Sequence, residues 1–183
     1  DIKPFALLTS EKTGISFTNT LRTAPELNIL NYIYYYNGGG VATADFNNDG
    51  RLDIIFTANQ AHPELYLNLG KMQFSSVALN LNTDFSTGWT NGVSIVDINN
   101  DGWMDIYLCR VGAHPRLTGQ NMLLVHQGLD ASGDPIFEEK AKGKKIHGYA
   151  ASTKGNTTLQ FYGINTDLLD AIADRNPTKW GKY

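Results

Sequence analysis

The sequence lacks most of the features that would place it in a common functional class. It holds a single cysteine, Cys109, so no internal disulfide forms, and its strand-like surroundings predict a small core residue. No run of 18 apolar residues is present, so no transmembrane helix is expected. The formal charge of −3 gives no electrostatic basis for binding nucleic acid. The chain starts at Asp1 without a signal-peptide pattern, as expected of a mature or trimmed form.

Motifs of the common catalytic sites are also lacking. The four histidines do not follow the H-E-x-x-H spacing of zinc proteases, and no G-x-S-x-G nucleophile motif occurs. Two of them, His62 and His114, stand at equivalent places before a proline, which favours a structural role. Acidic residues such as Glu64, Asp84 and Glu138 show no spacing that indicates the paired carboxylates of a glycosidase. The sequence therefore favours a protein without catalytic activity.

The sequence does contain one short acidic motif, which occurs twice. Residues 45–53 read D-F-N-N-D-G-R-L-D, and residues 97–105 read D-I-N-N-D-G-W-M-D. Oxygen-bearing side chains stand at positions 1, 3, 5 and 9, and glycine stands at the turn, which is typical of a calcium loop. Two calcium sites are predicted. Their ligands are the side chains of Asp45, Asn47, Asp49 and Asp53 with the Arg51 carbonyl, and those of Asp97, Asn99, Asp101 and Asp105 with the Trp103 carbonyl.

An EF-hand is excluded by the residues that follow each motif. An EF-hand needs an acidic residue at position 12, where this chain has Phe56 and Leu108. The apolar runs 52–56 and 104–108 predict strands instead of helices. The metal shell is therefore expected to close at position 9. A plain turn rich in Asp, Asn and Gly is the alternative reading.

The repeat extends beyond the motif. Residues 40–63 align with 92–115 without a gap, and the second copy then carries a small insertion at 116–120. Segments 65–70 and 123–128 correspond, and each is followed by a short strand-like stretch. Each copy thus predicts four short antiparallel strands, which is the pattern of a β-propeller blade. One blade buries its faces only against neighbouring blades.

The two ends of the chain follow the repeat less well. Residues 5–8 and 14–17 predict strands left over from another blade, and the tyrosine-rich run 31–37 predicts a strand or blade-closing segment with half-buried rings. A sugar-stacking surface is the alternative for these tyrosines. A third loop should fall near residue 163, but only Asn165 and Asp167 remain, so no calcium is expected there. Asp167 also suits the N-cap of a helical turn.

Segments 40–53 and 65–70 resemble the FG-GAP/VCBS repeat of integrin α-subunit propellers and of many secreted bacterial proteins. The runs 34–41 and 89–93 are similar to the cartilage-acidic-protein-like (ASPIC/UnbV-associated) branch, including surface proteins of Bacteroidetes. The resemblance covers about residues 1–150 and implies an all-β, calcium-stabilised propeller that binds rather than catalyses.

One β-propeller-type domain is expected over residues 1–183. Its parts are a leading partial blade or closing strand (1–37), two calcium-loop blades (38–80 and 88–141) and a degenerate third repeat (142–183). The resemblance implies about seven blades for a full ring, within the usual range for propellers. This partial propeller of about three blades is therefore expected to need missing blades or self-association.

These expectations define a function. The chain is predicted to be a non-catalytic, calcium-binding scaffold or adhesion module, secreted or at the cell surface, including the bacterial outer membrane. Its ligand would be a polysaccharide or a protein, held by loops 59–64 and 111–121. The alternative is a secreted propeller enzyme, a glycosidase or lyase acting on polysaccharide. The lysines at 140, 142, 144 and 145 leave an anionic partner open, although a solvated loop is the simpler reading.

Overall fold

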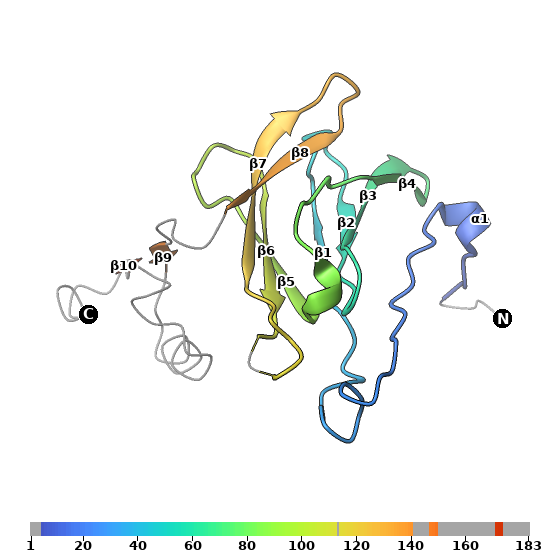
Figure 1. Ribbon diagram of the computed structural model, residues 1–183. Coiled ribbons are helices and arrows are strands. Elements are labelled where there is room, and N and C mark those ends of the chain that lie inside the picture. Colours follow the sequence, from blue (N-terminus) through green and yellow to red (C-terminus); the bar gives the residue numbers. More distant parts are fainter. Residues whose placement is uncertain (1–4, 113, 141–146, 150–170, 174–183) are drawn as a thin grey trace. The chain divides into compact units, whose positions relative to one another are not determined.

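The computed structural model describes residues 5–112, 114–140, 147–149 and 171–173, and the chain divides into two compact units, Asp1–Lys140 and Ala141–Tyr183 (Figure 1). In the second unit, β9 (His147–Tyr149) pairs in parallel with β10 (Ala171–Ala173). The predicted remnant of a third calcium loop, with Asn165 and Asp167, lies outside the described residues. Among the residues described, no helix is long and apolar enough to cross a membrane.

The first unit consists of two four-stranded antiparallel sheets and almost no helix, as the repeat predicts. In both sheets the strands follow one another in chain order. The first sheet contains β1 (Val41–Ala44), β2 (Asp53–Phe56), β3 (Glu64–Gly70) and β4 (Gln73–Val77). The second contains β5 (Thr90–Val96), β6 (Asp105–Arg110), β7 (Met122–Leu129) and β8 (Pro135–Lys140). The prediction of two similar blades is confirmed.

Each acidic motif forms the loop between the first two strands of its sheet. Ala44 pairs with Asp53 in the first sheet, and Val96 pairs with Asp105 in the second, so position 9 of each motif opens a strand. The loop glycines Gly50 and Gly102 have φ of 84° and 88°, in the left-handed region that favours glycine. The two loops therefore turn with the same backbone conformation.

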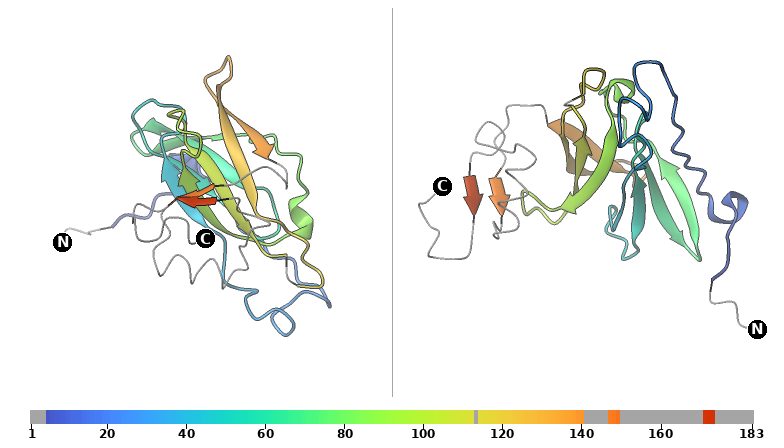
Figure 2. Two further views of the ribbon diagram at one scale, coloured as in Figure 1. Left: turned by 90° about the vertical axis from the view of Figure 1, so that its left-hand side faces the viewer. Right: turned by 90° about the horizontal axis from the view of Figure 1, so that it is seen from below.

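The two sheets share one hydrophobic core and lie side by side with β1 next to β5 (Figure 2). The fully buried side chains in this core include those of Phe46, Ile55, Leu65, Ile106, Leu108 and Leu124. Phe85, from the short 3-10 helix η1 (Phe85–Thr87) that precedes β5, joins them. Each sheet thus buries one face against the other, as blades of a propeller do.

The N-terminal segment differs from its prediction. Residues 5–8 and 14–17 form no strand; between them lies the short helix α1 (Ser10–Thr13). Phe5 is 89% exposed, so it is not part of the core. The segment still packs on the first sheet, because the Phe17 ring stacks on Phe56 at 4.8 Å. Side-chain contacts, and not strand hydrogen bonds, therefore hold this segment against the first sheet.

The tyrosine-rich run also forms turns and no strand. Tyr32 and Tyr35 are buried and pack on Trp89 in a second small core, whereas Tyr34 and Tyr36 are 58% and 68% exposed. The physical reason is the asparagine content: the side-chain oxygen of Asn28 accepts from Leu30 N at 2.9 Å, and that of Asn31 accepts from Asn28 N at 2.9 Å. Such local bonds compete with a strand ladder. The run therefore buries Tyr32 and Tyr35 and leaves Tyr34 and Tyr36 in solvent.

Candidate metal centres

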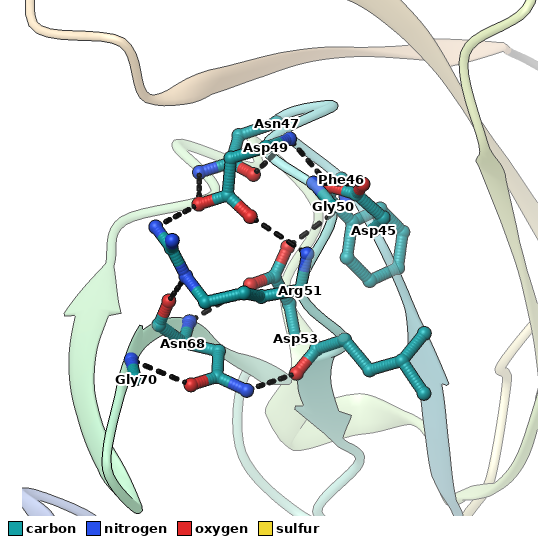
Figure 3. A network of polar contacts seen from close by, with 10 residues as sticks. Asp45, Phe46, Asn47, Asp49, Gly50, Arg51, Asp53, Asn68 and Gly70 are labelled. Atoms are coloured by element: carbon teal, nitrogen blue, oxygen red, sulfur yellow. Dashed lines mark hydrogen bonds and ion pairs between the residues drawn. The ribbon is translucent and has the colours of Figure 1, made fainter.

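In the first loop the predicted ligands belong to one hydrogen-bond network (Figure 3). The Asp45 carboxylate accepts from Asp49 N at 3.0 Å and from Gly50 N at 2.8 Å. One Asp49 oxygen accepts from Arg51 N at 2.9 Å, and the other accepts from the Asn47 amide at 3.0 Å. The side chains at positions 1, 3 and 5 are thereby held along the inside of the turn.

The second loop repeats this network. The Asp97 carboxylate accepts from Asp101 N at 3.1 Å and from Gly102 N at 3.0 Å. Asp101 accepts from Trp103 N at 2.9 Å and from the Asn99 amide at 2.8 Å. The hydrogen bonds of the two loops therefore agree closely.

The closing aspartates lie deeper than the other predicted ligands. Asp53 and Asp105 are both fully buried. Asp53 accepts from Phe46 N and from Asn68 N, each at 2.8 Å. The backbone donors thus come from the start of the loop and from β3, so one carboxylate fixes the loop to the sheet.

Asp105 repeats this arrangement. It accepts from Ile98 N at 2.9 Å and from His126 N at 2.8 Å. Sequence reasoning assigned the position-9 aspartates to the metal shell but missed this anchoring and its third-strand partners, Asn68 and His126. The equivalence of segments 65–70 and 123–128 was the available signal for them.

The carboxyl group of Asp53 is buried near two other carboxylates of its loop. Burial raises the pKa of this carboxyl above its usual value, and the nearby charges of Asp49 and Asp45 raise it further. The hydrogen bonds from Asn68 and Phe46 act in the opposite direction. Three carboxylates of one loop therefore lie close enough to repel one another, and a divalent ion would relieve that repulsion.

The two loops differ at position 7. In the first loop the Arg51 guanidinium contacts the Asp49 carboxylate at 2.5 Å, and its Nε donates to the Asn68 carbonyl at 2.7 Å. In the second loop the Trp103 ring stacks on His126, with ring centroids 4.6 Å apart and planes 14° from parallel. The first loop thus holds a built-in positive charge that the second lacks.

The donor set fits a hard cation, although the acidic groups are not gathered around one point. Among the described residues, no three His, Cys, Asp or Glu side chains form a group arranged to hold a metal ion. The carboxylates instead accept backbone N–H groups. A carboxylate has about four lone-pair sites, so the bonds described leave acceptor capacity on Asp45, Asp49 and Asp53. The structure joins the side chains at positions 1, 3 and 5 of each loop through hydrogen bonds, and metal ligation stays a prediction.

The other acidic residues considered for catalysis have local structural partners. Asp84 caps η1 by accepting from Ser86 N at 2.8 Å, and Glu64 accepts from the Tyr66 hydroxyl at 2.6 Å. Glu138 forms an ion pair with Lys140. Each of these three carboxylates is thus engaged within its own strand or turn.

His62, His114 and Cys109 all lie in the described part of the first unit. The His62 ring lies 4.7 Å from that of Phe85, and His114 contacts the Asn31 carbonyl at 3.3 Å. The two equivalent histidines thus have different partners. Cys109 is half-buried in β6, and burial raises the pKa of its thiol. The side chain of His147, and Lys142, Lys144 and Lys145, lie outside what the structure describes.

Comparison with known proteins gives two family matches. Residues 45–108 match the FG-GAP-like repeat, a span that runs from the first acidic loop through the second and into β6. Residues 126–183 match the C-methyltransferase C-terminal domain. The described start of this second match, residues 126–140, belongs to the β7–β8 hairpin of the second sheet.

The curated relatives agree with the first match. The chain is 27% identical over 128 residues to cartilage acidic protein 1 of Mus musculus, and equally to that of Homo sapiens. The alignment covers 68% of this chain but only 19% and 18% of these relatives.

Proposed function

We propose that this FG-GAP repeat protein is a calcium-stabilised binding module that acts outside the cell without catalysing a reaction. The repeat match and the similarity to cartilage acidic protein 1 support a binding or scaffold role. Extracellular calcium, at about 10⁻⁴–10⁻³ M, suits the weaker class of protein sites. The chain spans about a fifth of those relatives, so its role within a larger molecule is also part of the proposal.

The observation that carries the proposal is the same oxygen network in two loops, each with a buried aspartate beneath it. The side chains of Asp45, Asn47, Asp49 and Asp53, with the Arg51 carbonyl, would hold one calcium ion. Those of Asp97, Asn99, Asp101 and Asp105, with the Trp103 carbonyl, would hold the other. A bound ion would join each loop to its sheet through Asp53 or Asp105, both fully buried. Its chemistry would be structural, since it offsets carboxylate repulsion.

The partner surface is proposed at the end of the unit that carries the tyrosine-rich run. The sequence pointed to loops 59–64 and 111–121, but the N-terminal segment contacts both: Arg22 N donates to Gln60 at 2.6 Å, and the Asn31 carbonyl contacts His114. Tyr34 and Tyr36 remain exposed, and each meets a buried tyrosine edge-on. Exposed tyrosine rings that a buried neighbouring ring keeps in place are suited to contact a protein partner or to stack on a sugar ring.

Calcium titration tests the metal part of the proposal. Calorimetry should give two ions per chain, and calcium should raise the melting temperature by mass action. Asp49→Ala and Asp101→Ala should each remove one ion. Unchanged stoichiometry in either variant would reject the ligand assignment, and an equal melting temperature in calcium and in chelator would reject calcium altogether.

Ligand screening tests the surface. A glycan array, together with a panel of purified extracellular-matrix proteins, separates the two ligand classes. The double variant Tyr34→Ser/Tyr36→Ser should abolish whatever binding the native chain shows. Binding that survives this change would place the partner elsewhere on the molecule.

Methyl transfer and glycoside cleavage are not part of the proposal. The described start of the C-methyltransferase match, residues 126–140, belongs to the β7–β8 hairpin, and the His126 N–H of this hairpin bonds to Asp105 of the second acidic loop. The acidic residues considered for glycosidase chemistry bond to neighbours in their own turns and strands. No observation on the described residues favours either reaction over binding.

A further inference from the structure

We infer that His126 couples the two calcium loops, so that an ion in one loop strengthens binding in the other. The inference rests on the proposed function and adds a regulation of the same sites. It comes from a histidine that is 1% exposed and that bonds to both loops at once.

The bonding of the imidazole is fully specified by its partners. Its Nδ1 lies 2.9 Å from Gly128 N, and because a backbone N–H can only donate, Nδ1 accepts. In the neutral ring the proton is therefore on Nε2, which lies 2.9 Å from the Phe46 carbonyl oxygen and donates to it. Phe46 is position 2 of the first loop, whereas His126 belongs to β7 of the second sheet.

A continuous path of hydrogen bonds thus joins the two closing carboxylates. The His126 N–H donates to Asp105 at 2.8 Å, and its ring donates to the Phe46 carbonyl. The Phe46 N–H donates in turn to Asp53 at 2.8 Å. Asp53 and Asp105 are the position-9 residues of the two motifs, so both ends of the path are proposed metal ligands.

The ring has little freedom to absorb a movement. Trp103, position 7 of the second loop, stacks on His126 at 4.6 Å. Phe137 meets the same ring nearly edge-on at 4.9 Å, and also contacts Phe46 at 6.0 Å. Close packing passes a small shift on to the neighbouring groups because no space is left to take it up. An ion that fixes one closing carboxylate therefore also favours the fixed arrangement of the other loop.

The first repeat supplies a natural comparison. Asn68 stands where His126 stands in the second copy, and its backbone N–H makes the same bond to its own closing aspartate. Its side chain stays within its own sheet, donating to the Leu52 carbonyl at 2.9 Å and accepting from Gly70 N at 2.8 Å. His126→Asn therefore keeps the repeat's own residue at this position while removing the bond to Phe46.

Calorimetric calcium titration of four chains tests the coupling: the native chain, Asp49→Ala, His126→Asn and the variant with both changes. In the native background, Asp49→Ala disables the first loop and should also weaken binding at the second by about fivefold, the lower end of usual coupling energies. In the His126→Asn background, Asp49→Ala should leave the affinity of the second loop unchanged. Gln127→Ala, an exposed change on the same strand, should keep the fivefold effect.

The possible outcomes separate the inference from the proposed function. If the second loop binds calcium with the same affinity in the native and Asp49→Ala chains, the coupling is overturned and the calcium sites stand. No calcium binding in the native chain would overturn both. If His126→Asn fails to fold, NMR on Asp101→Ala replaces it: calcium at the first loop should shift the His126 and Ile98 amides. Amides that do not move would overturn the coupling.

Discussion

At the scale of single residues, position 7 distinguishes two otherwise equal loops. Arg51 puts a guanidinium on the Asp49 carboxylate, which is a proposed metal ligand, whereas Trp103 has no charge. Calcium at the first loop must therefore compete with a tethered cation. Since Arg51 is 47% exposed and exposed ion pairs contribute little, the competition is expected to be modest.

Arg51→Ala should therefore tighten calcium binding at the first loop by about two- to fivefold. Calorimetry on an Asp101→Ala chain isolates that loop. Arg22→Ala removes the same charge from an exposed position in the N-terminal segment and should leave the affinity unchanged. Weaker binding after Arg51→Ala would show that the arginine supports the site instead of competing for it.

Cys109 gives a second residue-scale prediction. Burial raises the pKa of its thiol, so at pH 8 it holds less thiolate than a free cysteine, and the thiolate is the reactive form. Alkylation by iodoacetamide should run at least about tenfold slower than that of glutathione, and should become faster as the pH rises. Unfolding in guanidinium should restore the normal rate. A native rate equal to that of glutathione would contradict the burial of this thiol.

The sequence predicts residues well where the chemistry is local. The spacing of Asp45, Asn47 and Asp49 predicts that they face one turn, because the loop itself determines this. The burial of Asp53 and Asp105 was not predictable, since their donors Asn68 and His126 lie on another strand. A carboxylate is seldom fully buried unless it is paired, and the pairing here depends on the folded sheet.

At the scale of elements, the first strands of the two sheets meet closely. A Cβ placed on Gly40 would lie 3.0 Å from Val93 N and 3.1 Å from Gly92 Cα, both backbone atoms that cannot move independently. A Cβ on Gly92, the equivalent residue of the second copy, would meet only the Cys109 side chain, at 3.4 Å or more. Glycine is thus favoured at position 40 of the first copy, whereas position 92 of the second copy has room for a methyl group.

Gly40→Ala should lower the free energy of unfolding by about 1–3 kcal/mol, because the sheets must separate to accept the methyl group. Gly92→Ala should change it by less than about 0.5 kcal/mol. Urea denaturation followed by tryptophan fluorescence measures both. Equal effects in the two variants would contradict the close approach of β1 and β5.

Elements were predictable only where the repeat provided a second copy. All eight strands of the two sheets were expected because apolar spacing and turns agree between the copies. Residues 5–8, 14–17 and 31–37 lie outside the aligned copies. Strands were wrongly predicted for the first two segments, and the third, predicted as a strand or a blade-closing segment, forms turns. Their short apolar runs resemble strands, but the side chains of Asn28 and Asn31 bond to nearby backbone and favour turns.

At the scale of the whole first unit, one buried side chain connects three parts of the chain. Asn59 is fully buried after β2, and its amide donates to the Gly38 carbonyl at 2.7 Å and to the Thr90 carbonyl at 2.9 Å. Its oxygen accepts from the Asn19 amide at 2.7 Å. The N-terminal segment, the first sheet and the second sheet therefore meet at this residue, which no local pattern identifies.

Asn59→Ala should lower the free energy of unfolding by about 2–4 kcal/mol, because it leaves buried carbonyl oxygens without a donor. It should also make residues 18–37 more open to limited proteolysis, since the bond from the Asn19 amide is lost and only the bond from Asn59 N to the Asn19 side-chain oxygen remains. Gln60→Ala is the matched control: its side chain bonds only to Arg22, so it should loosen the N-terminal segment while costing less than about 1 kcal/mol. Equal stability of Asn59→Ala and the native chain would mean that the Asn59 side chain contributes nothing to joining the two sheets. A loss confined to proteolysis would mean that Asn59 holds the N-terminal segment but contributes nothing between the sheets.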